Sequence, residues 1–306
     1  FFGLFVATSV LGISLGIVTP LCLSYFSELF PLENRGKTGG IAFFATLSST
    51  PFILAQIAKL DFMYKVLIVA LWRMWCLPLL FFISEEHYSH KGYGDRISTL
   101  TSVFLNNTFL LYFIAWLMFA FIDSFGTVVI DYAIGDFRPL LKIIEPVSAS
   151  LSALIAGFLC DYAGRKRILI FGFVSLGIAY AVLGLMPQFW FSWIIFFISD
   201  GIALGSLWAI LVIVLWGDIV KSSSEKFYAV GGSPFFLTQI FSLLLSPYLA
   251  MIPPNSLFSL ASFFLFLAVV PLMFAPETLP EKTLRERELR GYIEKAKRVR
   301  EKFTKG

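Results

Sequence analysis

Long apolar runs, separated by short polar turns, dominate the sequence. Each run is close to the length of about 20 residues that an α-helix needs to cross a bilayer. We place the predicted membrane spans at about 2–27, 39–58, 65–83, 105–128, 139–160, 168–186, 190–217, 228–250 and 256–275. The composition agrees, because 58% of the 306 residues are hydrophobic and only 14% are charged. Soluble domains are about 45–50% apolar. The pattern therefore predicts an all-α polytopic membrane protein.

The basic residues are divided unevenly between the two sides of the predicted bundle. If the turn after the first span is cytosolic, most of the 24 Lys and Arg residues lie on the cytosolic side, as membrane proteins prefer. We therefore predict a cell-membrane protein with a cytoplasmic C-terminus. Residues 281–303 read as a basic amphipathic helix that lies on the inner leaflet. The net charge of +4 sits in membrane-flanking segments, so it does not indicate a nucleic-acid partner.

The turn after the fifth span carries the most specific motif in the chain. It reads G-x-x-x-D-x-x-G-R-K-R and consists of Gly157, Asp161, Gly164, Arg165, Lys166 and Arg167. Asp161 follows the negative end of its own helix, so its carboxylate needs a partner. Arg165 is one candidate. The positive N-terminus of another helix that starts on the same side, near residues 37–39, is a better one.

This spacing resembles the loop signature of the major facilitator superfamily of secondary transporters, although Tyr162 stands where that family usually has Arg or Lys. A second motif, Y-x-x-E-x-x-P-x-x-x-R-G at 25–36, is similar to the end of the fourth helix in sugar-porter-like members. It contains Glu28, Arg35 and Gly36, and we expect Glu28 and Arg35 to pair. Pro276-Glu277-Thr278 resembles the sugar-porter tail motif.

If the first span is the fourth helix of that family, nine of twelve helices are present and the first three are missing. The chain also opens on Phe1, inside an apolar run, without an initiator Met. The predicted parts are a remainder of the N-terminal half with helices 4–6, a cytosolic linker, a C-terminal half with helices 7–12, and a basic amphipathic cytosolic tail. Their bounds are 1–83, 84–104, 105–278 and 279–306.

The resemblance implies that two six-helix halves rock about a central solute site. The fourth, seventh and tenth helices of the family line that site, and Asp123 and Asp200 fall on two of them. Ionisable groups inside a span usually serve function, so we expect Asp200, with Asp123 second, to bind the coupling proton. Alternatively, both are structural carboxylates bonded to neighbouring Ser, Tyr or Trp. Arg73 either contacts solute, packs between tryptophans or pairs with Asp200.

Three further side chains, Trp208, Gln56 and Gln239, are candidates for hydrogen bonding or stacking with the solute. The Ile122-Asp123 pair replaces the paired glutamine that sugar porters carry, which argues against sugar as the substrate. Near the outer end of the fifth span, Glu145 and Lys142 are expected to form a local ion pair.

The predicted function is secondary active transport of a small solute by alternating access, with proton symport as the first choice. Proton-coupled efflux is the alternative, as is a non-transporting receptor or scaffold with the same fold. An enzyme is disfavoured because no nucleophile–base set lies within a span. The three cysteines lack a paired spacing, so neither a disulfide framework nor a metal site is predicted. The expected partners are the solute, a proton and membrane lipids, without a cofactor.

Overall fold

Helices make up all the regular structure in the described part of the chain. The computed structural model describes residues 2–74, 100–135, 138–220, 224–249, 251–279 and 289. The helices are α1 (Phe2–Leu29), α2 (Arg35–Ile57), α3 (Phe62–Met74), α5 (Leu100–Phe104), α6 (Asn107–Ala133), α7 (Arg138–Ala163), α8 (Arg165–Leu185), α9 (Trp190–Leu207), the π-helix η3 (Trp208–Leu215), α10 (Trp216–Ile219), α11 (Ser224–Leu249) and α12 (Pro254–Phe274).

Eight helical segments within these ranges are long and apolar enough to cross a membrane, which confirms the predicted all-α polytopic class. One of them, Trp190–Ile219, joins α9, η3 and α10. The predicted third span, 65–83, falls on α3 and then leaves the described residues at position 75. Most of the predicted linker and nearly all of the predicted tail helix lie outside the description as well.

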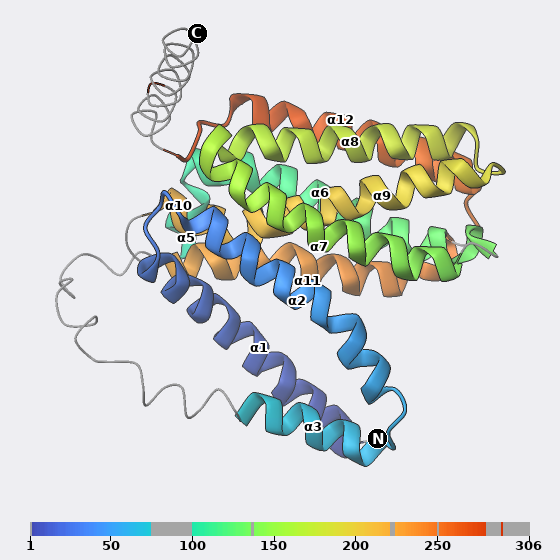
Figure 1. The fold of residues 1–306 in the computed structure, drawn as a ribbon, viewed down its shortest axis with the longest axis horizontal. Coiled ribbons are helices and arrows are strands. Elements are labelled where there is room, and N and C mark those ends of the chain that lie inside the picture. The colour runs from blue at the N-terminus through green and yellow to red at the C-terminus, as the bar shows by residue number, and fades with distance from the viewer. Residues whose placement is uncertain are drawn as a thin grey trace, which may run out of the picture.

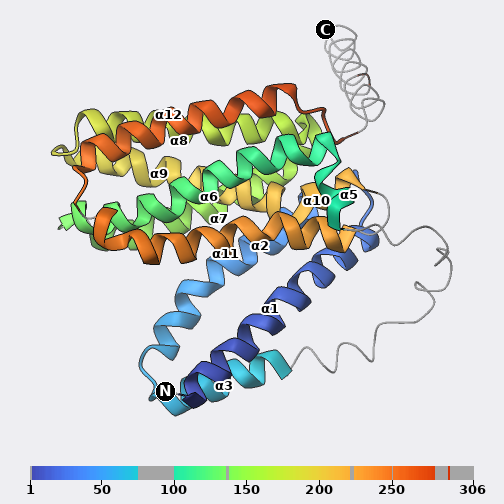
Figure 2. The ribbon, with the colours of Figure 1, turned by 180° about the vertical axis from the view of Figure 1, so that it is seen from behind.

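The spans from α6 to α12 pack into one bundle, the C-terminal bundle (Figures 1 and 2). Its interior contains many aromatic rings among aliphatic side chains. Trp193 stands at 89° to Phe258 with 6.1 Å between ring centroids, and Tyr180 meets Phe196 edge to face at 4.8 Å. Because lipid tails are as apolar as these side chains, close packing of this kind, rather than exclusion of water, holds membrane helices together.

The first helices meet the C-terminal bundle at one end only. There α1 ends, α2 begins and α7 turns into α8; we name it the motif end. Figures 1 and 2 show α1 and α2 leaving the bundle toward their other ends, where α3 lies beside α1. At the motif end α2 packs against α7, and α1 against α11. The two groups of helices are thus in contact at the motif end and splayed at the opposite end.

Candidate functional site: a buried polar network at the motif end

Asp161 lies at the last turn of α7 and points at the first turn of α2. Its carboxylate accepts hydrogen bonds from the backbone N–H groups of Gly36, at 3.0 Å, and Lys37, at 2.7 Å. The residue is 6% exposed. A carboxylate at a helix N-terminus satisfies free N–H groups and lies at the positive end of the helix dipole. This is the position that the sequence motif predicted.

Three glycines allow α2 and α7 to approach closely enough for that contact. A Cβ added to Gly157 would lie 2.6 Å from the carbonyl oxygen of Gly36 and 2.7 Å from the Cα of Gly40. A Cβ on Gly40 would in turn meet the Cα of Gly157 at 2.8 Å. Because these neighbours are backbone atoms, a side chain would force the helices apart. The glycine at the start of the motif is therefore explained by helix contact.

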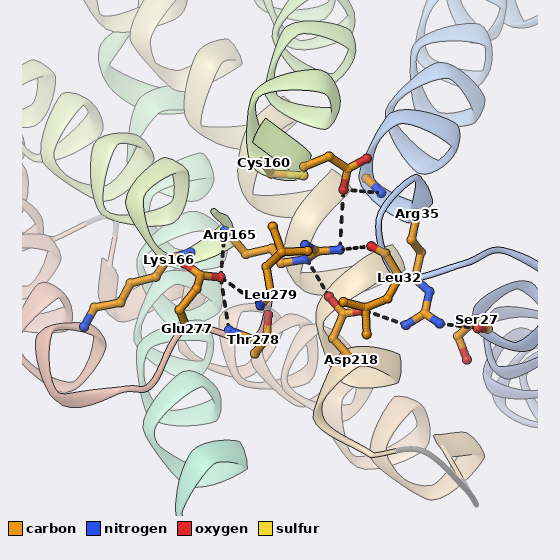
Figure 3. A network of polar contacts seen from close by, with 12 residues as sticks. Ser27, Leu32, Arg35, Cys160, Arg165, Lys166, Asp218, Glu277, Thr278 and Leu279 are labelled. Atoms are coloured by element: carbon orange, nitrogen blue, oxygen red, sulfur yellow. Dashed lines mark hydrogen bonds and ion pairs between the residues drawn. The ribbon is translucent and has the colours of Figure 1, made fainter. Parts of the chain in front are cut away.

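Asp218, in α10, joins the two arginines of the motifs (Figure 3). Its side chain has no exposed surface; one oxygen pairs with Arg35, and the other lies 2.5 Å from Nε of Arg165. Asp161 adds a longer contact of 3.4 Å to Arg165 Nη2. Two guanidinium groups and two carboxylates thus balance in a buried space, which is the arrangement that makes burial of charge tolerable.

The expected pair between Glu28 and Arg35 is wrong. Glu28 is exposed on the last turn of α1, whereas Arg35 turns inward to Asp218. The sequence placed the two residues at a helix end on the same side but could not reveal that a carboxylate from α10 lies closer. The carboxylate is that of Asp218, and it belongs to α10, the short helix that continues the span after η3.

Both arginines also bind the backbone of the turn between α1 and α2. Arg35 donates through Nη2 to the carbonyl of Ser27 and, at 3.3 Å, to that of Phe30. Arg165 donates through Nη2 to the carbonyl of Leu32 at 2.7 Å. Since Arg165 belongs to α8, its guanidinium physically connects the C-terminal bundle to the α1–α2 turn (Figure 3).

A serine cluster forms a second contact between α1 and the C-terminal bundle. The hydroxyls of Ser24 and Ser224 lie 2.7 Å apart, and Ser27 lies 3.2 Å from the same Ser224 hydroxyl. All three are buried. The motif end is therefore closed by hydrogen bonds as well as by ion pairs.

Glu277 caps the start of α8. Its carboxylate accepts from the backbone N–H groups of Arg165 and Lys166, at 2.9 and 3.1 Å, and from those of Thr278 and Leu279, at 3.0 and 3.2 Å. Lys166 returns the contact through Nζ, which donates to the carbonyls that end α12, those of Met273 and Ala275. The segment after α12 is thus tied to the motif turn.

Gly164 permits this cap because of its backbone. It has φ +98°, and a Cβ there would lie 2.5 Å from an oxygen of Glu277. Any other residue would be strained in this conformation and would collide with the carboxylate. The second fixed glycine of the motif is therefore required by the turn.

The two intramembrane aspartates lie away from this network, inside the C-terminal bundle. Asp123, on α6, and Asp200, on α9, are both half-buried. They interact electrostatically with each other and with Glu145 of α7 and Tyr180 of α8. Among the described residues, no hydroxyl or indole N–H donates to either carboxyl. The two predicted residues thus lie within electrostatic range of each other.

Arg73 and Lys142 were predicted as possible partners of these acids, but their side chains lie outside the described residues. The helix of Arg73, α3, lies beside α1 and apart from the C-terminal bundle (Figures 1 and 2). Gln56 is exposed on the last turn of α2, and Gln239, also exposed, donates to the Ser124 hydroxyl at 3.3 Å.

Trp208 begins the π-helix and lies between aromatic rings of three other helices. It stacks on Phe43 of α2 at 6.3 Å and meets Trp116 of α6 and Phe235 of α11 edge to face, at 5.9 and 4.9 Å. Its indole N–H is buried and has no hydrogen-bond partner in the described part of the chain. π-Helical turns often occur at functional sites, and here one carries an unsatisfied donor.

Sequence reasoning missed Asp218 and Glu277 as members of the network and Tyr180 as a neighbour of the aspartates. Asp218 did have a signal, because an acidic residue at a span end faces the same side as Arg35 and Arg165. Glu277 lay within a recognised tail motif but was assigned no role. Tyr180 had no signal beyond its position in an apolar helix.

These helices and the buried motif network define a multi-pass helical membrane protein of the transporter class. The sequence profile of the Major Facilitator Superfamily matches residues 143–303, more than half of the chain. The chain therefore belongs to the Major Facilitator Superfamily, whose members are membrane transporters of small molecules and are generally not enzymes. No curated protein matches the chain.

Proposed function

We propose that the protein is a secondary active transporter that moves a small solute by alternating access, with proton symport as its mode. The observation that carries the proposal is the asymmetry of contact between the two groups of helices. Ion pairs and helix-end contacts close the motif end, while the same helices diverge at the opposite end. A protein that exposes a central site to one side at a time needs contacts of this kind.

In this proposal the network is a gate, and the cytosol lies on the motif side. The two rocking bodies are a half that contains residues 1–83 and a half that contains 105–278, joined by the linker 84–104. The basic segment 279–306 lies on the inner leaflet. To open the gate, Arg35 must leave Asp218 and Asp161 must leave the N-terminus of α2. Water then replaces each lost contact, so the two states differ by only a few kcal/mol.

The solute site lies between the gate and the opposite end of the protein, where helices of both groups face each other. Trp208 supports this location because its ring touches Phe43 from α2 as well as α6 and α11. Its free indole N–H offers a donor to a solute oxygen. Gln239 and Gln56 are the further polar candidates. The replacement of the sugar-porter glutamine pair by Ile122 and Asp123 favours a solute other than a sugar.

Counterflow in liposomes tests transport without assuming a coupling ion. Full-length protein is reconstituted with a high internal concentration of one unlabelled solute, and uptake of its radiolabelled form is followed for a panel of sugars, amino acids and organic cations. Transient, saturable accumulation of one solute supports the proposal. Specific binding of a solute without counterflow would instead favour a receptor or scaffold with a transporter fold.

Proton coupling and its direction need a second measurement with the same liposomes. Asp200→Asn is expected to abolish accumulation driven by a pH gradient while sparing counterflow, which needs no net proton movement. If an outward-directed proton gradient drives the solute into empty vesicles rather than out of loaded ones, proton and solute move in opposite directions, and proton-coupled efflux replaces symport. Wild-type behaviour of the variant in both assays would mean that Asp200 does not couple proton to solute.

A further inference from the structure

The π-helix η3 connects two residues to which the proposed function gives different tasks. Trp208, the candidate solute contact, begins η3, and Asp218, the gate carboxylate, follows it in α10. Ile213 lies in the second half of η3. Because all three belong to one continuous span, a change in the winding of η3 would move the gate carboxylate relative to the rest of that span.

A π-helix is wound more loosely than an α-helix. Its hydrogen bonds join residues five apart, whereas those of an α-helix join residues four apart. Where the winding returns to α, this spacing shortens by one residue, so one carbonyl oxygen near the end of the π segment is left without an amide partner. Returning the whole segment to α winding would turn the helix after it by one residue position, about 100°.

Tyr228, on α11, supplies a hydrogen bond near the end of the π segment. Its hydroxyl donates to the carbonyl oxygen of Ile213 at 2.6 Å. Tyr228 is 2% exposed, so little water reaches this bond, and a buried carbonyl that loses its donor is unfavourable. The hydroxyl therefore stabilises the π winding of η3 relative to α winding.

The same face of α11 also contacts α10. A Cβ added to Gly217, in α10, would lie 2.7 Å from the hydroxyl oxygen of Tyr228. Three residues further along α11, a Cβ on Gly231 would lie 2.5 Å from Nε1 of Trp216. Residues three apart on a helix share a face. One face of α11 thus holds two successive residues of α10 beside the end of η3.

The helices of the other group touch this junction as well. A Cβ on Gly39 of α2 would lie 3.0 Å from Cγ2 of Ile213. A Cβ on Gly217 would collide with Cβ of Ser27, which belongs to α1. The junction of η3 with α10 therefore lies where the two groups of helices meet, and Tyr228 contacts it from within the C-terminal bundle.

We propose that Tyr228 is a positioning residue for the gate, and that its hydroxyl keeps η3 in the π winding that places Asp218 between Arg35 and Arg165. The proposal rests on the proposed function and adds a residue outside the buried ion pairs. Without the hydroxyl, η3 relaxes toward α winding, α10 turns, and the carboxylate leaves the arginines. The gate then opens more often although every charged group of the network is still present.

Tyr228→Phe tests this role while keeping the ring and its packing. In full-length protein in liposomes, spin labels on cysteines introduced at Asn34 and Tyr162, with the native cysteines replaced, report the distance across the motif end. The ratio of open to closed forms should rise at least about fivefold, as expected when a buried carbonyl loses its donor. Tyr248→Phe, which removes an exposed hydroxyl from the same helix, should leave the ratio unchanged.

A double-mutant cycle separates positioning from general loosening of the bundle. Adding Tyr228→Phe to Asp218→Asn should leave the ratio of the Asp218→Asn protein unchanged, because no carboxylate remains to be positioned. Gly231→Ala, whose Cβ would meet the ring of Trp216, should also raise the ratio only while Asp218 is present. Gly232→Ala, with nothing within 4 Å of its Cβ, should have no effect.

A structure of the Tyr228→Phe protein shows the winding itself. Residues 208–215 should be α-helical in it, with the carboxylate of Asp218 turned away from Arg35. Each variant is first checked for the wild-type melting temperature. If Tyr228→Phe melts early, Gly231→Ala and its control Gly232→Ala carry the test.

Three results would overturn the proposal. Tyr228→Phe gives the same ratio as Tyr248→Phe; it raises the ratio by the same factor with and without Asp218; or its structure keeps the π winding with Asp218 in place. Failure of the gate gives a different result, because Asp218→Asn would then stay closed, which refutes the gate and the positioning role together. An open Asp218→Asn protein with an unresponsive Tyr228→Phe refutes the positioning role alone.

Discussion

Neutralising Asp218 is expected to open the gate. In Asp218→Asn, two guanidinium groups lose the carboxylate that lies between them, and the side chain of Arg165 has no exposed surface in which to find water. Breaking a buried ion pair in this way costs about 3–5 kcal/mol. Arg165 keeps its contacts with Asp161, at 3.4 Å, and with the Leu32 carbonyl, at 2.7 Å. We therefore take the lower limit, about 3 kcal/mol.

That penalty applies only while the gate is closed, because opening exposes the arginines to water. A difference of about 3 kcal/mol corresponds to roughly a hundredfold change in the equilibrium between closed and open forms. A gate that is open in about 1% of molecules would then be open in about half of them. The closed state would no longer dominate.

Spin-label distances across the motif end measure this shift. Asn34 and Tyr162 are exposed on opposite sides of the gate, so cysteines there can carry labels in a background in which Cys22, Cys76 and Cys160 have been replaced. Full-length Asp218→Asn should show a second, longer distance with a population comparable to the short one. Asp61→Asn, the matched loss of an exposed carboxylate, should show the short distance alone. A correctly folded Asp218→Asn protein with only the short distance would refute the reasoning.

Three further substitutions test other contacts. Gly157→Ala should lengthen the same label distance, because its Cβ would meet the backbone of α2 at 2.6 Å, whereas Gly12→Ala, with nothing within 4 Å, should not. Glu277→Gln should lower the free energy of unfolding by about 0.3–2 kcal/mol by weakening the cap of α8, measured by thermal melting with the exposed Glu28→Gln as its control; equal melting of both would contradict the cap. Trp208→Phe keeps a stacked ring but removes the indole N–H, so the KM for the transported solute should rise about fivefold with kcat little changed, as loss of one hydrogen bond predicts. An unchanged KM would leave Trp208 as a packing residue.

The sequence predicted the spans and the contact of Asp161 with α2 because both depend on local information. Apolar length identifies a span, and the motif spacing identifies a helix end that needs a positive partner. The same motif spacing includes Gly157 and Gly164, which the structure places at a close helix approach and at a turn. These features follow from the chemistry of a few neighbouring residues and from the side of the membrane on which they lie.

The partner of Arg35 could not be predicted in the same way. Glu28 was seven residues away in the sequence and on the same side, but pairing depends on which helices are neighbours in the bundle. α10 places Asp218 between two arginines that are 130 residues apart, and nothing in the spacing of any one motif contains that information. The contact of α7 with α9 is similar, because the close approach of Gly201 to the backbone carbonyl of Glu145 depends on which helices are neighbours.

Paired distances at both ends of the protein test the alternating-access account most directly. One label pair at Asn34 and Tyr162 reports the motif end, and a second pair at Lys59 and Tyr248 reports the opposite end in full-length protein in liposomes. The account predicts opposite changes: in Asp218→Asn the first distance lengthens while the second shortens, relative to the unsubstituted background. If the second distance stays constant or lengthens together with the first, the substitution has only loosened the bundle, and the central claim is contradicted.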